Sequence, residues 1–504
     1  MLARAHTVAF EGIEARPVEV QCAVSPGLPS FSIVGLPDKA VSEARERVRA
    51  ALNTLAIALP SKRITVNLAP ADLPKEGSHF DLPIALALLA ALDILPKDAV
   101  EGLLALGEMS LDGALVPVIG ALPAAMTAAT EQRALMCPRG CGPEAAWVGD
   151  AEVIAARDLG EAIRHVSGQT ALSPAEPGQI AVDAAGRDFA EVTGQERAKR
   201  ALEIAAAGRH HVLIVGPPGS GKSMLAARLP SILPPLSAME ALETSMIHSL
   251  CGMLPEGGIS MARPFRTPHH TASPVALTGG GKGAKPGEIS LAHNGVLFLD
   301  ELPEFARSVL DTLRQPVETG EILVSRANAH VRYPCRFLLV AAANPCRCGH
   351  MADPARACAK APACGEDYLG RISGPLLDRF DMRIEVPPVS FARLDLPPPA
   401  EGSAEIAARV EAARQIQAVR YADHPEMRSN ADAEGKVLAT VAAPDADGRA
   451  LLGQAEERFG LTGRGYHRIL RVARTIADLA GTEHVARDHL AEAIGFRLSF
   501  NVGA

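Results

Sequence analysis

The chain has 504 residues, of which 48% are hydrophobic and 21% charged, a composition that excludes a largely disordered protein and allows roughly two to four folded domains. The sequence has no uninterrupted apolar run of the roughly 18 residues that a membrane helix needs, and its first residues, MLARAHTVAFEG, lack the apolar core of a signal peptide. We therefore expect a soluble, cytoplasmic protein without a membrane partner. The formal charge of −8 gives no overall sign of nucleic-acid binding, but it does not exclude a ring in which only the channel is basic.

Residues 1–168 alternate short apolar runs with helical patterns, which predicts an α/β domain. We expect strands at 18–24, 31–34 and 64–68, and helices at 40–55 and 82–92. A small, turn-rich stretch at 169–188 predicts an interdomain linker. A second domain should therefore begin near residue 189.

The phrase HVLIVGPPGSGKSML, residues 211–225, contains a buried strand, a glycine loop and the start of a helix. It matches the P-loop pattern GxxxxGK[ST] at every position. The glycines let backbone N–H groups surround a phosphate chain, Lys222 would neutralise its outer oxygens and the Ser223 hydroxyl would hold Mg²⁺. The predicted nucleotide-binding residues are Gly216, Pro217, Pro218, Gly219, Ser220, Gly221, Lys222 and Ser223.

A second apolar run, residues 295–299, is typical of a buried parallel strand and is followed by Asp300 and Glu301. An acidic pair in this position commonly caps a helix. After a P-loop, however, it indicates ATP hydrolysis, in which Asp300 would hold Mg²⁺ and Glu301 would polarise the attacking water. ATP and Mg²⁺ are therefore the expected ligands.

Three phrases in the first domain resemble the Lon-protease-like domain at the front of magnesium-chelatase-like AAA+ ATPases of the ComM/YifB family. They are GLPSFSIVGLPDKAVSEARERVRAAL (27–52), PADLPKEGSHFDLPIALALLAA (70–91) and GEMSLDGALVPVIGAL (107–122). Lon-type proteolysis uses a serine activated by a lysine. Here the serine position falls on Asp81, with Ser78 as a neighbouring alternative, and GALPAA (120–125) offers no lysine. The resemblance thus implies a non-proteolytic platform or nucleic-acid-binding domain.

The resemblance extends to an AAA+ core at 189–390 and an all-helical lid at 391–504. The VTGQ phrase before the P-loop resembles the AAA+ entry segment, although a simple turn at Gly194 is an alternative. Residues 263–295 resemble the helix-two insert of this clade, which implies that Lys282 and Lys285 project towards DNA in a central pore. The adjacent His269 and His270 are more typical of a packed pair than of a metal site.

A hairpin is expected between strands at 322–324 and 337–341, with Arg326 near its tip. It resembles the pre-sensor hairpin of the same clade, which implies that Arg326 touches DNA; a solvated surface arginine is the alternative. Asn344 matches the sensor-one residue that positions water against the γ-phosphate.

Four cysteines, Cys346, Cys348, Cys358 and Cys364, lie close together and could form a tetrahedral Zn²⁺ site. The family pattern has a further cysteine where this chain has Lys360, so the fourth ligand would be Cys364 or His350. Zinc and a loop of reduced, unliganded cysteines both remain open.

Two arginines complete the resemblance. LLDRFD (376–381) resembles the arginine-finger phrase, which implies that Arg379 reaches the nucleotide of a neighbouring subunit, with an ion pair to Asp378 or Asp381 as the alternative. TGRGYHRILRVA (462–473) resembles the sensor-two helix and assigns Arg464 to the γ-phosphate, with Arg468 as its competitor.

The resemblance implies a hexameric ring, formed with ATP and single-stranded or branched DNA. Its implied activity is that of an ATP-dependent helicase or branch-migration motor in homologous recombination of DNA taken up during natural transformation. Two alternatives remain. A magnesium-chelatase motor subunit would require a porphyrin-handling partner, and an AAA+ remodeller would act on proteins.

Overall fold

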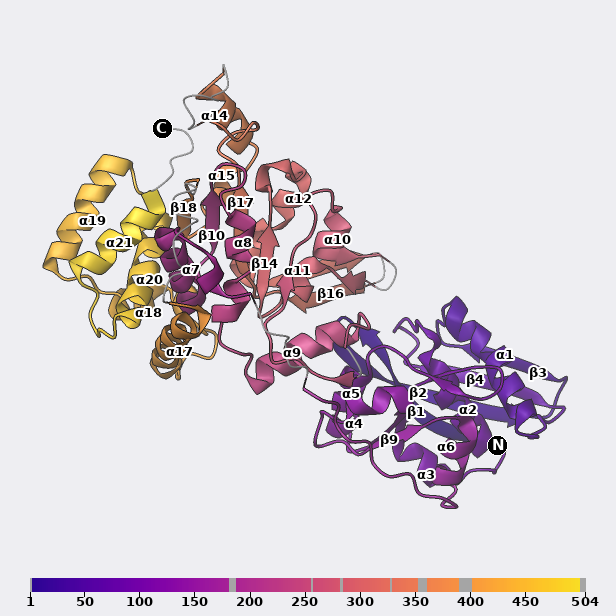
Figure 1. Ribbon diagram of the computed structural model, residues 1–504. Coiled ribbons are helices and arrows are strands. Elements are labelled where there is room, and N and C mark those ends of the chain that lie inside the picture. Colours follow the sequence, from indigo (N-terminus) through magenta and orange to yellow (C-terminus); the bar gives the residue numbers. More distant parts are fainter. Residues whose placement is uncertain are drawn as a thin grey trace.

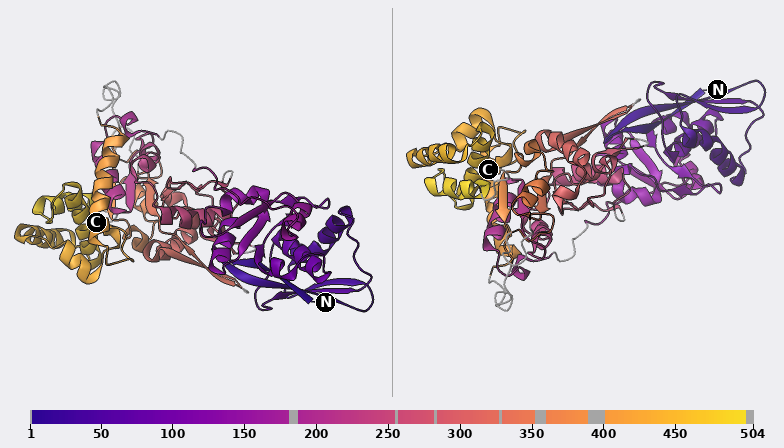
Figure 2. Two further views of the ribbon diagram at one scale, coloured as in Figure 1. Left: turned by 90° about the horizontal axis from the view of Figure 1, so that it is seen from below. Right: turned by 90° about the horizontal axis from the view of Figure 1, so that it is seen from above.

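The computed structural model describes residues 2–180, 187–254, 257–281, 284–326, 329–351, 360–388 and 401–498. The molecule is elongated: an N-terminal sheet unit lies at one end, a second α/β unit lies in the middle and the C-terminal helices lie at the other end (Figure 1, Figure 2). In the described part of the chain, every helix is too short or too polar to cross a membrane.

A seven-stranded sheet organises the N-terminal unit, with strand order β3-β4-β2-β1-β5-β8-β9. Its strands are β1 (Leu2–Glu11), β2 (Glu14–Ser25), β3 (Ser30–Val34), β4 (Arg63–Ala69), β5 (Leu103–Ala105), β8 (Ala134–Pro138) and β9 (Val153–Ala156). The two longest strands, β1 and β2, form an antiparallel hairpin that turns at Gly12, where φ is +67°. Glycine adopts this left-handed conformation without steric cost. β2 pairs with β4 from Glu19 to Ser25, so the turn end of the hairpin extends beyond β4.

Helices cover the sheet of the N-terminal unit. They are α1 (Lys39–Thr54), α2 (Asp81–Ala91), α3 (Lys97–Glu101), α4 (Ala121–Thr130), α5 (Gly142–Ala145) and α6 (Leu159–Val166), and a small hairpin, β6 (Glu108–Met109) with β7 (Leu115–Val116), lies beside them. All eleven residues of α2 are buried, as expected for a helix that is apolar on every side. This helix forms the centre of the N-terminal core.

Asp81, the residue at the expected position of the Lon serine, is fully buried at the start of α2. Its carboxylate accepts two hydrogen bonds from Arg47, at 2.6 and 2.9 Å, and one from the Met109 N–H at 3.0 Å. Burial raises the pKa of Asp81, whereas Arg47 opposes this shift. The neighbouring alternative, Ser78, donates a hydrogen bond to Glu108. Asp81 thus ties α2 to α1 and to β6.

The second unit contains a five-stranded sheet of order β11-β14-β17-β10-β18 in which every described pairing is parallel. The strands are β10 (Val212–Val215), β11 (Phe265–Arg266), β14 (Val296–Leu299), β17 (Leu338–Ala343) and β18 (Met382–Glu385). Every residue of β10, β14 and β17 is buried, which explains their continuous apolar runs. Because the strands are parallel, the loops that follow them meet at one edge.

Helices and two small hairpins surround this sheet. The helices are α7 (Glu196–Gly208), α8 (Lys222–Ala226), α9 (Ala238–Ser249), α10 (Pro274–Thr278), α11 (Glu288–Leu291), α12 (Arg307–Thr312), α13 (Arg314–Thr319), α14 (Ala363–Leu369) and α15 (Gly374–Leu377). The hairpins are β12 (Gly279–Gly280) with β13 (Lys285–Pro286), and β15 (Glu321–Arg326) with β16 (Ala329–Pro334).

The C-terminal region is helical, with α17 (Ser403–Arg420), α18 (Gly435–Val441), α19 (Ala446–Phe459), α20 (Gly463–Leu479) and α21 (Arg487–Leu498). One face of α20, including Ile469, Val472 and Ile476, is buried in the same core as Val212 and Ile214 of β10. The C-terminal helices therefore pack directly on the ATPase-like sheet.

Candidate nucleotide-binding site

Three of the predicted site segments converge at the carboxyl edge of the five-stranded sheet. The glycine loop follows β10, Asp300 follows β14 and Asn344 follows β17. The register pairs Val215 with Ala343, and Leu299 with Ala341, so these loops begin at nearly the same level. Parallel α/β sheets bind ligands at this edge.

The glycine loop has the backbone shape that a phosphate cradle needs. Gly219 and Gly221 adopt positive φ, at +76° and +89°. A Cβ atom on Gly216 would lie 2.3 Å from the Val386 carbonyl oxygen, so only glycine fits there. Within the described part of the chain, the buried Ser220 hydroxyl has no hydrogen-bond partner. The loop thus offers glycines in a conformation that other residues rarely adopt and a polar group without a partner, which fits an anionic ligand.

Lys222 lies where the loop meets α8, and its ammonium is directed back into the loop. Its Nζ donates to the carbonyl oxygens of Gly216 (2.8 Å) and Pro217 (2.9 Å) and to Asn344 Oδ1 (3.0 Å). Burial lowers the pKa of Lys222, whereas nearby Asp300 opposes the shift. The structure thus brings the predicted phosphate-binding lysine together with the predicted sensor-one residue.

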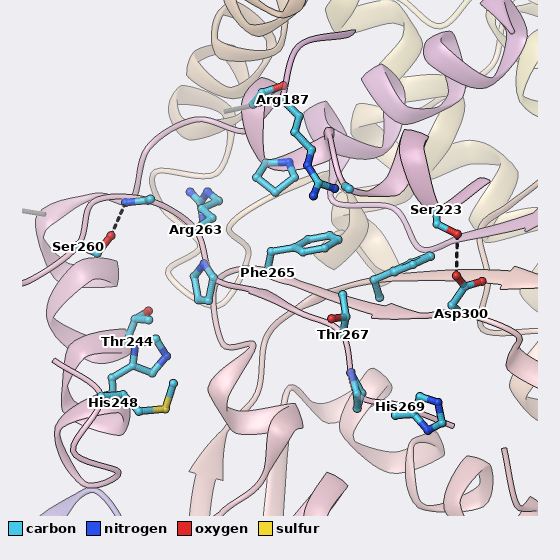
Figure 3. A pocket seen from close by; sticks show the side chains of 18 of the residues that line it. Arg187, Ser223, Thr244, His248, Ser260, Arg263, Phe265, Thr267, His269 and Asp300 are labelled. Atoms are coloured by element: carbon cyan, nitrogen blue, oxygen red, sulfur yellow. Dashed lines mark hydrogen bonds between the residues drawn. The ribbon is translucent and has the colours of Figure 1, made fainter. Parts of the chain in front are cut away.

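Ser223 and Asp300, the two predicted Mg²⁺ ligands, are in direct contact. Ser223 Oγ donates to Asp300 Oδ2 at 2.6 Å (Figure 3). A hydroxyl and a carboxylate at the carboxyl edge of a sheet are oxygen ligands of the type that Mg²⁺ prefers. The residues therefore fit this cation.

Glu301 follows Asp300 in a left-handed conformation, with φ of +51°, which costs energy for a residue other than glycine. Its N–H donates to Asp300 Oδ1 at 2.9 Å. Its carboxylate oxygen Oε2 lies 3.7 Å from His270 Nδ1, and the His270 ring lies 4.1 Å from that of His269, centroid to centroid. Glu301 and Asp300 both line a cavity that is also bordered by residues of α8 and β11.

That cavity has a volume of about 960 Å³ and extends from Ser223, Asp300 and Glu301 to α9 (Figure 3). Its walls include Phe265 and Phe298, whose rings stack at 6.1 Å with an interplanar angle of 17°. Cationic and imidazole groups also line it: Arg187, Arg263, His248, His269 and His270. Sequence reasoning missed Arg187 and His248, which are single residues outside any motif, and gave no role to Arg263, the first residue of the predicted insert.

Two further contacts support the glycine loop from distant segments. Gln195, in the predicted VTGQ entry segment, donates to the Pro387 carbonyl at 2.6 Å and approaches the Ser220 carbonyl at 3.5 Å. Gly349 lies against the other side of the loop, because a Cβ there would be 2.3 Å from Pro218 Cδ. The entry segment and the cysteine-containing segment therefore both brace the loop.

Arg464 does not approach its own glycine loop. It lines a second cavity, of about 560 Å³, together with His211 and Phe337, which directly precede β10 and β17. These residues mark the amino edge of the sheet, whereas the glycine loop is at the carboxyl edge. Within one chain, Arg464 and the glycine loop therefore lie at opposite edges of the sheet.

Arg379 lies at the same amino edge and is only 8% exposed. Its guanidinium donates to the carbonyls of Arg314 (2.7 Å) and Pro375 (2.6 Å) and pairs with Glu318 at 2.7 Å. The sequence-based alternative of an ion pair to an adjacent aspartate is wrong. The reason is that those two aspartates are engaged elsewhere, Asp378 with Arg497 at 2.6 Å and Asp381 with Arg468 at 2.5 Å.

The predicted DNA contacts lie on the two hairpins. Arg326 ends β15, next to residues outside the described part of the chain, and Lys285 is exposed at the start of β13. Lys282 lies outside the described residues. Lys285 does not line the cavity next to Asp300 and Glu301.

The cysteine segment follows Asn344. Cys346 Sγ and Cys348 Sγ are 3.2 Å apart, and Cys364 is the second residue of α14. Cys358 lies outside the described residues. Within the described ranges, no cluster of three histidine, cysteine or acidic side chains could hold a metal ion, so zinc gains no support.

Comparison with known proteins gives one consistent family. The family model for magnesium chelatase, subunit ChlI, matches residues 188–394. The model for subunit ChlI of Mg-chelatase matches residues 18–140, and the model for the C-terminal region of magnesium chelatase subunit ChlI matches residues 400–497.

Two relatives match along nearly the whole chain and a third along about three fifths of it. The competence protein ComM of Haemophilus influenzae is 45% identical over 502 residues, covering 98% of this chain and 97% of its own length. The uncharacterized protein YifB of Escherichia coli is 43% identical over 507 residues, covering 98% and 96%. The magnesium-chelatase 38 kDa subunit of Rhodobacter capsulatus is 27% identical over 350 residues, covering 62% of this chain and 86% of its own length. The chain therefore belongs to the ComM/YifB family of magnesium-chelatase-like AAA+ proteins.

Proposed function

We propose that this protein is an ATP hydrolase that assembles into a ring and moves DNA strands, as a helicase or branch-migration motor in recombination of incoming DNA. The observation that carries the proposal is the convergence of Lys222, Ser223, Asp300 and Asn344 at one sheet edge, with Glu301 in the adjoining cavity. The competence link rests on the likeness to a relative named a competence protein.

The chemistry follows from these residues. The glycine loop and Lys222 would bind the phosphates of ATP, and Ser223 and Asp300 would hold Mg²⁺, which neutralises phosphate charge when bound. Glu301 would accept a proton from the attacking water, and Asn344 would orient that water. For this to happen Lys222 Nζ must exchange its two carbonyl partners for phosphate oxygens. Those carbonyls hold it in the loop until the substrate arrives.

A ring follows from the separation of the two sheet edges. Arg379 and Arg464 lie at the amino edge, so they would serve the nucleotide of an adjacent subunit. A homo-oligomer in which one amino edge meets the next carboxyl edge is a heterologous assembly, which forms a ring where the rotation between subunits closes and an open filament where it does not. We propose a hexamer.

We propose a role for each domain in the order of the chain. Residues 1–168 are a non-proteolytic Lon-like platform, 169–188 a linker, 189–390 the AAA+ core and 391–504 the lid. Arg326, Lys282 and Lys285 would contact DNA phosphates in the channel.

Glu301→Gln tests the hydrolytic part of the proposal. It should retain ATP binding and lose at least ~10²-fold in turnover, because the cradle remains while the proton acceptor is gone. Steady-state phosphate release and a separate nucleotide-binding titration measure both quantities. Near-normal turnover would remove Glu301 from the role of base.

The substrate class is tested with the wild-type protein. ATP hydrolysis should rise with single-stranded or branched DNA and stay unchanged with an unfolded protein. Stimulation by unfolded protein alone would favour a protein remodeller. Stimulation by neither would favour a chelatase-like motor, a reading that the relatives named magnesium-chelatase subunits support.

A further inference from the structure

In the described part of the chain, the N-terminal unit contacts the second unit in two regions, and one of them adjoins helix α9 of the cavity wall. Helix α9 has Thr244 and His248 on the cavity wall (Figure 3). At its last residue, Ser249 donates a hydrogen bond to Glu144 of α5. One helix therefore faces the cavity and contacts the N-terminal unit.

The segment after α9 strengthens this contact, which we name the α5–α9 seam and define by Glu144, Trp147, Ser249 and Gly257. Trp147 Nε1 donates to the Gly257 carbonyl at 3.1 Å, and Trp147 packs against the cluster of Leu236, Ala241 and Ile259. A Cβ on Gly257 would lie 2.7 Å from the Glu144 N atom, so the backbones approach closely. Burial raises the pKa of Glu144, opposed by its hydrogen bond from Ser249. The seam is thus tightly packed and partly desolvated.

The second contact involves the β15–β16 hairpin. The β1–β2 turn lies against β16, because a Cβ on Gly12 would be 2.4 Å from Val331 Cγ1. Ile13 packs on the core that contains Val331 and Tyr333. The turn of the long N-terminal ribbon therefore supports the hairpin whose end carries Arg326.

Helix α4 joins the two contacts. At its start the Leu122 N–H donates to Glu144 at 3.0 Å. Further along, Thr127 Oγ1 donates to the Ala15 carbonyl of β2 at 2.8 Å and, within α4, to the Pro123 carbonyl at 3.3 Å. A ten-residue helix has a length of about 15 Å and bends little. A displacement at α9 would thus reach the β1–β2 turn through one stiff element.

We propose that the N-terminal unit is a lever that transmits the nucleotide state of the cavity, through α5, α4 and the β1–β2 ribbon, to the β15–β16 hairpin. The proposal rests on the proposed function for the identity of the ligand and for the task of the hairpin. Coupling over such a distance needs direct measurement, because packing alone does not establish it.

Trp147, the single tryptophan of the chain, reports on the seam without any label. A non-hydrolysable ATP analogue with Mg²⁺ should change the Trp147 emission, with the same midpoint as an independent binding titration. Lys222→Ala, which removes the phosphate-binding ammonium, should give no change at the same concentrations. Unchanged wild-type emission at saturation would overturn the lever.

Hydrogen–deuterium exchange tests the far end. In the wild type, the analogue should change exchange in peptides covering β15 and β16. Thr127→Val keeps the shape of the side chain but removes the bond to Ala15, so it should reduce that hairpin response at least ~5-fold while the Trp147 response remains. Thr130→Val is the matched control, because the Thr130 hydroxyl bonds only within α4, to Met126 at 2.9 Å.

Equal hairpin responses in both threonine variants would overturn the lever. If Thr127→Val fails to fold by circular dichroism, Ser249→Ala tests the same route from its other end. None of these readouts uses DNA. A wild-type protein whose ATP hydrolysis is not stimulated by DNA would therefore contradict the proposed function without contradicting the lever.

Discussion

Mixing two inactive variants tests whether Arg379 acts across a subunit interface. Lys222→Ala removes a charge at the carboxyl edge of the sheet, and Arg379→Ala removes one at the amino edge. The four-residue strand β10 separates these edges by about 13 Å. Each variant thus retains the half-site that the other lacks.

The expected recovery can be calculated. In rings assembled at random from equal amounts, about one interface in four joins an intact glycine loop to an intact arginine edge, so turnover should reach about a quarter of the wild-type value. The activity should follow the product of the two mole fractions, with a maximum at equal mixing.

The structure also gives Arg379 a role within its own chain, which needs a control. Its bond to the half-exposed Glu318 contributes roughly 1 kcal/mol or less, whereas its charged hydrogen bonds to two carbonyls contribute about 1.5–3 kcal/mol each. Arg379→Ala should therefore lower the melting temperature, while Glu318→Gln should lower it less and keep full hydrolysis.

Phosphate release is the assay for the mixed rings, and native mass spectrometry shows whether mixed rings form. No recovery at any ratio, in rings proven to be mixed, would refute action in trans.

Four other outcomes are expected. Asn344→Ala, which removes an acceptor of the lysine ammonium, should lower kcat by ~10–10²-fold with little change in nucleotide affinity, and an unchanged kcat would exclude a role in hydrolysis. Burial lowers the pKa of both His79 and His211 to about 4, so these side chains stay neutral in the folded state at pH values at which the unfolded chain, with a pKa of about 6.5, is protonated. The contribution of these histidines to the free energy of unfolding should be fully present above about pH 6.5. It should fall by about 1.4 kcal/mol per pH unit and per histidine as the pH falls towards 4, which urea unfolding at several pH values would measure. If zinc is bound, elemental analysis should give about one ion per chain and Cys348→Ser should lower it, whereas metal-free active protein would exclude the site. Arg326→Ala should weaken DNA binding equally for all sequences and reduce its salt dependence by about one counterion, and an unchanged salt slope would exclude a phosphate contact.

The glycine loop could be predicted because the residues that determine its structure are adjacent in the sequence. Val212–Val215 are all apolar, since a central parallel strand is buried on both faces, and the required glycines follow directly. The same holds for β14 and Asp300. These segments needed no knowledge of distant partners.

Other features depend on residues far away in the chain. The sequence pattern did not predict β1, because this strand mixes charged and apolar residues and its buried residues lie in two cores, one with α2 and one with α4. The partner of Arg379 is Glu318, 61 positions earlier, while sequence proximity suggested two adjacent aspartates. The contact of α5 with α9 has no sequence motif at all. Such contacts are decided by tertiary packing, which periodicity and spacing do not encode.

The placement of the two half-sites at opposite edges has a genetic consequence. A subunit with a defective glycine loop keeps its arginine edge and its assembly surfaces, so it would enter rings together with normal subunits. Each such subunit would have an inactive nucleotide site and would still occupy a position in the ring that a normal subunit could otherwise take. In cells that carry a normal copy as well, loop alleles should therefore be dominant, whereas alleles that prevent folding should be recessive.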